Sequence, residues 1–372
     1  MGNPYDAFLL EEAGFRPPGQ EEPADAPTFD LVRTGSAALK ALGGGGFDMV
    51  LADYLLPDTS GPDLARRIRQ AHPSVPVVIV TSNTDLGGAG KGSAGHSEPN
   101  LFIWYGAHSF LRALVRLQED ERNAPRLVAA GHALALLLVE DEPNFYSHFV
   151  PLLYERTEAS ARDLAPRPPS TWGVIDNRPL VLLRRNFEDA CEVLYRYRSY
   201  ILAVISDMCF PVQGELKSDA GLRLLYRARA VNAHLPMAVH SRELEHKSAA
   251  QEAGAKFLWK DSPHFLPELD NFLVEFCGFG PFVFRWPAGE VYGVAHNLAE
   301  LRKLIADVPD VVFEHHALHF DFSSWLAVHG YLELARRVRD VSITDPAVRQ
   351  LLLDLIDEQL NANGKPADLP KP

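Results

Sequence analysis

Four apolar segments between residues 136 and 260 constrain this chain more than any other feature, because each one ends in a polar side chain that can hold a phosphoryl group. Each segment is typical of a buried strand, and open parallel sheets place their sites at the carboxyl ends of strands. We therefore expect the polar side chains to meet in one pocket. In chain order they are Glu140 and Asp141, Asp207, Ser241, and Lys260.

These residue types suit one chemistry. Mg²⁺ is typically held by one or two carboxylates together with phosphate oxygens, so Glu140 and Asp141 form a candidate Mg²⁺ site. Asp207 is then the candidate nucleophile, which forms an acyl phosphate. An ammonium and a hydroxyl stabilise the charge on a transferred phosphoryl group, and Lys260 and Ser241 supply them. A single acid after a strand is more often a helix cap or a solvated loop residue, but the ordered series favours the pocket.

The series resembles the receiver domain of two-component response regulators over most of residues 133–278. Pro211 stands four residues after Asp207, and Phe257 stands three before Lys260, at the aromatic switch position of that family. The resemblance implies that the backbone carbonyl of Cys209 completes the metal shell and that a histidine kinase or phosphotransfer protein donates the phosphoryl group to Asp207.

The resemblance also implies a fold and a mode of signalling. The expected fold is a flavodoxin-like, doubly wound α/β domain over residues 126–279, with five parallel strands in the order 2-1-3-4-5. Phosphorylation would switch binding of a downstream protein, or a homodimer, through the face made by the fourth helix, fifth strand and fifth helix. Two departures from the family are Asp261, where a cis-proline is usual, and a longer segment at 213–219.

A second copy of the same pattern lies upstream, over residues 1–125, and we predict a degenerate five-stranded receiver there. Asp53 and Thr81 occupy the acceptor and hydroxyl positions, but Tyr105 stands where the lysine should be. No acidic pair precedes the expected helix at 5–13, and the chain begins where the first strand should already have ended. We expect strands at 28–33, 47–53, 75–81 and 101–105, and we interpret Asp53 as a structural acid.

Residues 280–372 have a different pattern, which predicts a small α+β interaction domain. A hairpin at 281–294 should precede helices at 297–307, 323–338 and 345–361. His315, His316 and His319 leave three alternatives open, namely a zinc site, a phosphohistidine and a structural cluster. We favour the structural cluster because clustered histidines are commoner at an interface or a strand–helix junction than at a metal or phosphotransfer site.

Composition excludes several classes of function. A length of 372 residues suggests two or three domains at about 150 residues each. A formal net charge of −13 argues against nucleic acid or an anionic membrane as partner. Apolar runs are too short for a membrane span, and three widely spaced cysteines suit a reducing compartment. We expect a cytoplasmic protein.

A second resemblance covers nearly the whole chain. Its layout is similar to the N-terminal region of some bacterial proteins related to phosphoenolpyruvate synthase and pyruvate phosphate dikinase, in which a catalytic region follows. The stretches that carry it are 5–14, 139–147, 278–285 and 322–326. Three hypotheses follow: a phosphorylated response regulator with no enzymatic activity beyond its own phosphorylation and dephosphorylation, a scaffold that is not phosphorylated, and the regulatory arm of such an enzyme.

Overall fold

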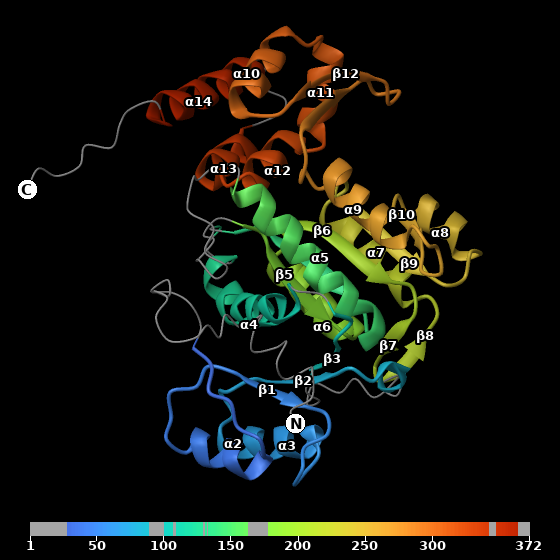
Figure 1. Cartoon of the computed structure of the whole chain (residues 1–372). Helices are drawn as coiled ribbons and strands as arrows, with labels where there is room; N and C mark the ends of the chain where they lie inside the picture. The colour runs from blue at the N-terminus through green and yellow to red at the C-terminus, as the bar shows by residue number, and fades with distance from the viewer. Residues whose placement is uncertain are drawn as a thin grey trace, which may run out of the picture.

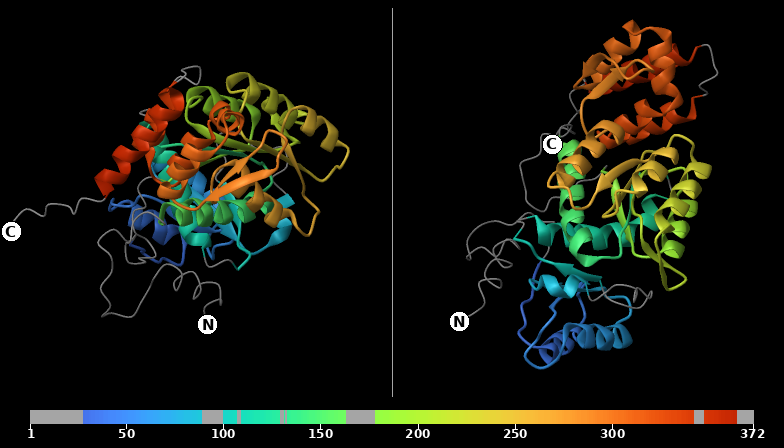
Figure 2. Two further views of the ribbon diagram at one scale, coloured as in Figure 1. Left: turned by 90° about the horizontal axis from the view of Figure 1, so that it is seen from above. Right: turned by 90° about the vertical axis from the view of Figure 1, so that its right-hand side faces the viewer.

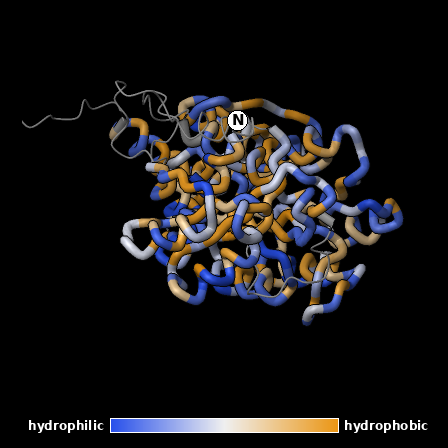
Figure 3. The backbone as a smooth tube through the Cα atoms, turned by 60° about the horizontal axis from the view of Figure 1, so that its bottom comes forward, coloured by the Kyte–Doolittle hydropathy of each residue, from blue (hydrophilic) through white to orange (hydrophobic). Residues whose placement is uncertain are grey.

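The computed structural model describes residues 28–88, 100–106, 109–128, 131, 133–162, 178–341 and 347–363. Two sheets, each made of parallel strands, lie one above the other with helices between them, and a smaller module lies at one end of the upper sheet (Figures 1 and 2). Apolar segments run through the interior, and many of the outermost loops are hydrophilic (Figure 3). The predicted helix at 5–13 lies outside the described residues.

The first sheet contains three parallel strands in the order β1-β2-β3 among the described residues. Alternate residues of a strand point to opposite faces of a sheet. Ile79 packs on the side of α3 (Gly61–Ala71), and Val78 and Val80 pack toward α4 (Phe110–Leu127) and α5 (Pro143–Arg162). The elements of this region are α2 (Gly35–Leu42), β1 (Val50–Asp53), α3 (Gly61–Ala71), β2 (Val77–Thr81), η1 (Thr84–Gly88) and β3 (Asn100–Ile103).

The predicted strand at 28–33 is wrong, so the described part of the first copy has three of the four strands predicted by residue range, and two fewer than a five-stranded receiver. In a receiver with the strand order 2-1-3-4-5, residues 28–33 would form the second strand, which pairs only with the first strand. No described strand lies beside residues 28–33. Leu31 is 63% exposed, so the apolar residues that suggested a strand do not enter the sheet.

The second sheet contains five parallel strands in the order β5-β4-β6-β9-β10. Numbered along the chain this is 2-1-3-4-5, the order predicted for residues 126–279. Helices α5 and α9 cover one face, and α6, α7 and α8 cover the other. The elements are β4 (Ala135–Val139), α5 (Pro143–Arg162), β5 (Leu180–Arg184), α6 (Phe187–Arg196), β6 (Ile201–Asp207), α7 (Ala220–Val231), β9 (Met237–Ser241), α8 (His246–Glu252), β10 (Lys256–Trp259) and α9 (Phe265–Phe276).

Helix α4 (Phe110–Leu127) belongs to both sheets. The sequence pattern predicts a helix at 107–121 here, and the structure continues it to Leu127, for more than a further turn. Its carboxylate at Asp120 is buried and binds the guanidinium of Arg178 at 2.7 Å, the hydroxyl of Tyr154 at 2.6 Å and the backbone N–H of Val181 at 2.8 Å. These bonds attach the C-terminal half of α4 to β5 of the second sheet and to α5.

Helix α5 also joins the two sheets, because its side chains cover the open edge of β3. The backbone N–H of Ile103 donates to Oγ of Ser147 at 2.8 Å, and the Tyr146 hydroxyl donates to the carbonyl of Leu101. An edge strand otherwise leaves such groups unpaired. The first sheet is therefore held by the helix that directly follows Glu140 and Asp141.

A hairpin that the sequence analysis missed accounts for the longer segment at 213–219. Strands β7 (Phe210–Val212) and β8 (Glu215–Lys217) pair antiparallel. The two residues between them, Gln213 and Gly214, have φ of 52° and 81°. Two positive φ angles in a two-residue loop match the twist of a hairpin.

The C-terminal module joins a hairpin to five helices among the described residues. Helix α11 was not predicted, and the single helix predicted at 323–338 is wrong: it is two helices, separated at Gly330, whose φ is 82°. Arg339 donates to the carbonyl of Ser199, just before β6, so the module packs where the strands begin. Its elements are β11 (Phe282–Arg285), β12 (Val291–Ala295), α10 (Leu298–Asp307), α11 (Asp310–Leu318), α12 (Asp321–Val328), α13 (Leu332–Asp340) and α14 (Val348–Asn363).

Candidate functional site

Three of the predicted site residues meet directly at the carboxyl edge of the second sheet. The ammonium Nζ of Lys260 lies 2.8 Å from Oε2 of Glu140 and 2.9 Å from Oδ2 of Asp207. Strands β4, β6 and β10 end at or just before these three residues. Since all three side chains are buried, a single ammonium is held between two carboxylates in a poorly solvated pocket.

The backbone fixes the Asp207 carboxylate. Its Oδ1 accepts a hydrogen bond of 2.7 Å from the N–H of Met208. Gly221, at the start of α7, approaches the same strand end so closely that a Cβ there would lie 2.2 Å from the carbonyl oxygen of Asp207. A residue with a side chain at position 221 would therefore displace the strand end that presents Asp207.

The pocket has more acids than its one lysine neutralises. Burial raises the pKa of Asp141 to about 7, and the charge of Asp207 adds to that rise. Burial also raises the pKa values of Glu140 and Asp207, against the pull of Lys260. For Lys260, burial opposes the charged form, but Glu140 and Asp207 outweigh it and raise its pKa. The ammonium stays charged, and the acids gain from any further cation.

The other predicted residues surround this centre. Ser241 is buried at the end of β9, where its Oγ lies 2.9 Å from Nδ1 of His246. Phe257 is partly buried on β10. Burial raises the pKa of the Cys209 thiol to about 11, and Asp207 adds to that rise, so this thiol is not an activated nucleophile.

The rim of the pocket carries an aromatic ring between two cations. Nζ of Lys260 lies 4.1 Å from the ring centre of Phe145, and the guanidinium carbon of Arg242 lies 5.1 Å from it. Arg242 also donates to Glu142 at 3.2 Å. The arginine is half-exposed, so it can contact an anionic group that approaches Lys260 from solvent.

His240 was given no role by the sequence analysis, although it lies next to Ser241. It is fully buried, and within the described part of the chain neither ring nitrogen has a hydrogen-bond partner. Its Nδ1 lies 3.6 Å from Oε2 of Glu140 and 3.7 Å from Oδ1 of Asp207. The available signal was an ionisable residue inside an otherwise apolar strand, directly before a strand end.

Among the described residues, the corresponding edge of the first sheet is built from other side chains. Asp53 accepts a weak hydrogen bond from the N–H of Leu55 at 3.3 Å, and Thr81 ends β2. Tyr105, at the position of the lysine, instead donates to Asn144 of α5 at 2.7 Å and stacks on His148. The residue that replaces the lysine therefore contacts the second sheet's helix.

The donor set of the second pocket fits a hard divalent cation. Glu140 and Asp207 both contact the Lys260 ammonium, and burial followed by the charge of Asp207 raises the pKa of the neighbouring Asp141. Mg²⁺ prefers such oxygens. Glu140, Asp141 and Asp207 are the side chains that would hold it, with the carbonyl of Cys209 as the further ligand that the sequence resemblance implies.

The C-terminal histidines have structural partners. The backbone N–H of Arg285 donates to Nε2 of His316 at 2.8 Å, and Nδ1 of His316 lies 2.7 Å from Asp321. His319 contacts His234 of the second domain, with ring centres 4.8 Å apart. Both contacts favour the structural interpretation of this cluster.

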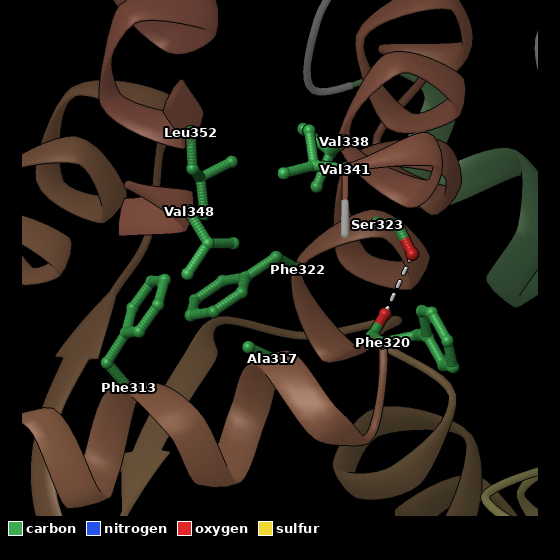
Figure 4. Close-up of a pocket in the computed structure, with 9 residues that line it drawn as sticks. All are labelled: Phe313, Ala317, Phe320, Phe322, Ser323, Val338, Val341, Val348 and Leu352. Atoms are coloured by element: carbon green, nitrogen blue, oxygen red, sulfur yellow. Dashed lines mark hydrogen bonds between the residues drawn. The ribbon is translucent and has the colours of Figure 1, made fainter. Parts of the chain in front are cut away.

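A small cavity in the same module is too small for a ligand. It has a volume of about 30 Å³ and lies among α11 to α14, with Phe313 and Phe322 facing Val348 and Leu352 (Figure 4). Ligand pockets usually enclose about 300 Å³ or more, so this cavity is a gap between apolar side chains.

Comparison with known proteins finds a family match over part of the chain. The response regulator receiver domain matches residues 23–93. Over 76 residues the chain is 38% identical to the sensory transduction protein RegX3 of Mycobacterium bovis and to that of Mycobacterium tuberculosis. The match covers 20% of this chain and 28% of each relative, so the chain spans little more than a quarter of their length.

A solved structure, the response regulator receiver domain protein from Clostridium thermocellum, shares 16% identity with a TM-score of 0.28, covering 38% of this chain and 91% of that chain. The family model and the RegX3 match show that part of this chain, including residues 23–93, is similar to response regulator receiver domains. The similarity lies on the first copy of the pattern. None of the helices among the described residues has the length and apolar character needed to span a membrane.

Proposed function

We propose that residues 126–279 form a second receiver domain, and that Asp207 accepts a phosphoryl group from a histidine kinase or phosphotransfer protein. The observation that carries the proposal is the Lys260 ammonium held 2.9 Å from Asp207 and 2.8 Å from Glu140 in a buried pocket. The strand order β5-β4-β6-β9-β10 supports it, because it places the ends of β4, β6, β9 and β10 at one edge.

In the proposed reaction one carboxylate oxygen of Asp207 attacks the phosphorus atom of the donor. An O–P bond forms as the P–N bond to the donor imidazole breaks, and the leaving imidazole takes a proton. Lys260 stabilises the equatorial oxygens of the phosphoryl group, and Ser241 can donate a hydrogen bond to them. The backbone N–H of Met208 holds Asp207 in position.

A divalent cation, when bound, neutralises repulsion between the acceptor carboxylate and the incoming phosphoryl group. Glu140 and Asp141 are the proposed holders of Mg²⁺ beside Asp207, and their raised pKa values mark the charge that a cation relieves.

The proposed output is a change in the surface around β10. To reach the phosphoryl group, Ser241 must give up its contact with His246, which lies at the start of α8. Phe257 on β10 can then move inward, as the family resemblance implies. These two movements repack α8, β10 and α9, and the downstream protein partner would bind there.

We further propose that the first copy is a degenerate receiver with a structural role. At the end of β3 the position expected for a lysine holds Tyr105, which donates to Asn144 of α5. The contacts of α5 with β3 support a role as a docking platform joined to the active copy. The same contacts favour the alternative that the whole chain is a scaffold. A regulatory arm of a phosphoenolpyruvate synthase-like enzyme remains a prediction from the sequence.

Acetyl phosphate with Mg²⁺ tests the proposal. Intact mass spectrometry of the full chain should show one added phosphoryl group, and Asp207→Asn should show none. Asp53→Asn is the matched control and should be modified like the wild type. An unmodified wild type under saturating conditions would favour the scaffold.

A further inference from the structure

The feature that points beyond the proposed function is the imidazole of His240 beside the acids. Glu140, Asp207 and His240 each offer a ligand atom, and the three atoms lie within 4.8 Å of one another. All three side chains are buried. A Mg²⁺ site made only of oxygen ligands does not need an imidazole beside its carboxylates.

The His240 ring is not satisfied by the protein. Within the described residues, both ring nitrogens lack a hydrogen-bond partner, although a buried, unpaired polar group costs about 1–3 kcal/mol. Its surroundings are otherwise apolar, since Phe149 and Phe265 meet the ring edge to face, with centres 5.2 and 6.0 Å away. A neutral imidazole offers one nitrogen lone pair to a metal ion.

The spacing of the ligand atoms is close to that of a metal shell. Nδ1 of His240 lies 3.6 Å from the Glu140 oxygen and 3.7 Å from the Asp207 oxygen. Ligands at ~2.1 Å from a tetrahedral metal are separated by ~3.4 Å. The three ligand atoms all lie within 4.8 Å of one another, so small movements of the three side chains would bring them onto one ion.

We propose that His240 is a nitrogen ligand in the cation site, so that this pocket prefers a first-row transition-metal dication such as Co²⁺ or Zn²⁺ over Mg²⁺. Imidazole binds such ions well, whereas Mg²⁺ takes oxygen ligands. The inference rests on the proposed function only in using the same pocket. The ion would lie between Glu140, Asp207 and His240, and Lys260 would remain available to the phosphoryl group.

Metal titration of the full chain, after removal of metals with a chelator, tests the proposal. Calorimetry should give a Co²⁺ affinity at least ~10-fold tighter than that for Mg²⁺, and His240→Leu should weaken Co²⁺ binding by ~10-fold or more. Mg²⁺ binding should change less than ~3-fold, because its oxygen ligands remain. Equal Co²⁺ affinity in wild type and His240→Leu would overturn the proposal.

An exposed group of Glu243, Glu245 and His246 could also bind Co²⁺, so His246→Gln is the matched control and should retain the tight site. Proton NMR with Co²⁺ gives a second readout: one strongly shifted, solvent-protected imidazole N–H, lost in His240→Leu and kept in His246→Gln. If His240→Leu does not fold, His240→Gln and the wild-type spectrum decide, and a spectrum without that signal contradicts the proposal.

Acetyl phosphate separates this proposal from the proposed function. If the wild type and His240→Leu both accept a phosphoryl group with Mg²⁺ and bind Co²⁺ equally, only the metal proposal fails. If Co²⁺ binds through His240 and Asp207 is never modified, only the phosphoacceptor role fails.

Discussion

Nζ of Lys260 lies 2.9 Å from Oδ2 of Asp207, and less than a tenth of either side chain is exposed. An ion pair this deeply buried contributes little net stability, because desolvation offsets attraction, but removing one partner leaves an uncompensated charge. The ion pair instead places a fixed positive charge beside the carboxylate that we propose as phosphoacceptor.

Replacing that lysine should therefore destabilise the protein. With Lys260→Met, the free energy of unfolding at pH 8 should fall by about 3–5 kcal/mol, since Glu140 and Asp207 lose their cation. The loss should be smaller at pH 5, because the acids can then bind protons. Urea unfolding measures it, and Lys217→Met, in an exposed pair with Glu215, should have little effect. Equal effects of the two substitutions would contradict a buried ion pair.

The raised pKa of Asp141 gives a prediction with a defined pH window. Between its usual value of 3.8 and about 7, the folded protein binds a proton that the unfolded chain has lost, so metal-free stability falls as pH rises through that window. Asp141→Asn removes this loss and should be more stable than the wild type by about 1–4 kcal/mol at pH 8, but not at pH 4. Asp261→Asn, at an exposed position, is the control. A stability gap that does not depend on pH would show that Asp141 titrates normally.

The bond between Ser147 and Ile103 tests whether α5 holds the first sheet. Ser147→Ala leaves the buried N–H of Ile103 without an acceptor, which should cost about 1–3 kcal/mol. Hydrogen exchange should become faster at Ile103 in particular, with Ser248→Ala on the surface as control. Unchanged protection at Ile103 would mean that another group satisfies this amide.

The anchor of α4 can be tested in the same way. Arg178→Met leaves the buried carboxylate of Asp120 without its cation, and unfolding should cost about 3–5 kcal/mol less. Arg196→Met, in an exposed pair with Glu192, should change stability by less than about 1 kcal/mol. Similar values for both would argue that α4 is not fixed to β5.

The sequence predicts the second sheet well, for a physical reason. Fully buried parallel strands appear as continuous apolar runs such as Leu136–Val139, and short connections place their polar ends together. The elements that were missed depend on contacts between distant residues. Asp120 binds Arg178, which is 58 residues away. A local sequence pattern does not contain such a contact, and it therefore predicts a connection beyond residue 121, where α4 in fact continues.

His240 was missed for a related reason, because only the folded sheet shows that its Nδ1 lies near Glu140 and Asp207. The strand predicted at 28–33 failed in the opposite direction: its apolar residues have the local pattern of a strand, but no described strand lies beside them. Local periodicity indicates that a segment can form a strand, but whether the segment pairs in a sheet depends on which other strands lie beside it.

The most direct test of the phosphoacceptor role is beryllofluoride binding, measured by fluorine NMR with and without Mg²⁺. Beryllofluoride forms a complex with a carboxylate that imitates an acyl phosphate. Protein-bound fluorine signals should appear in the wild type only when Mg²⁺ is present, and Asp207→Asn should abolish them. Signals that persist in Asp207→Asn, or none in the wild type at saturation, would contradict the assignment of Asp207 as the phosphoacceptor.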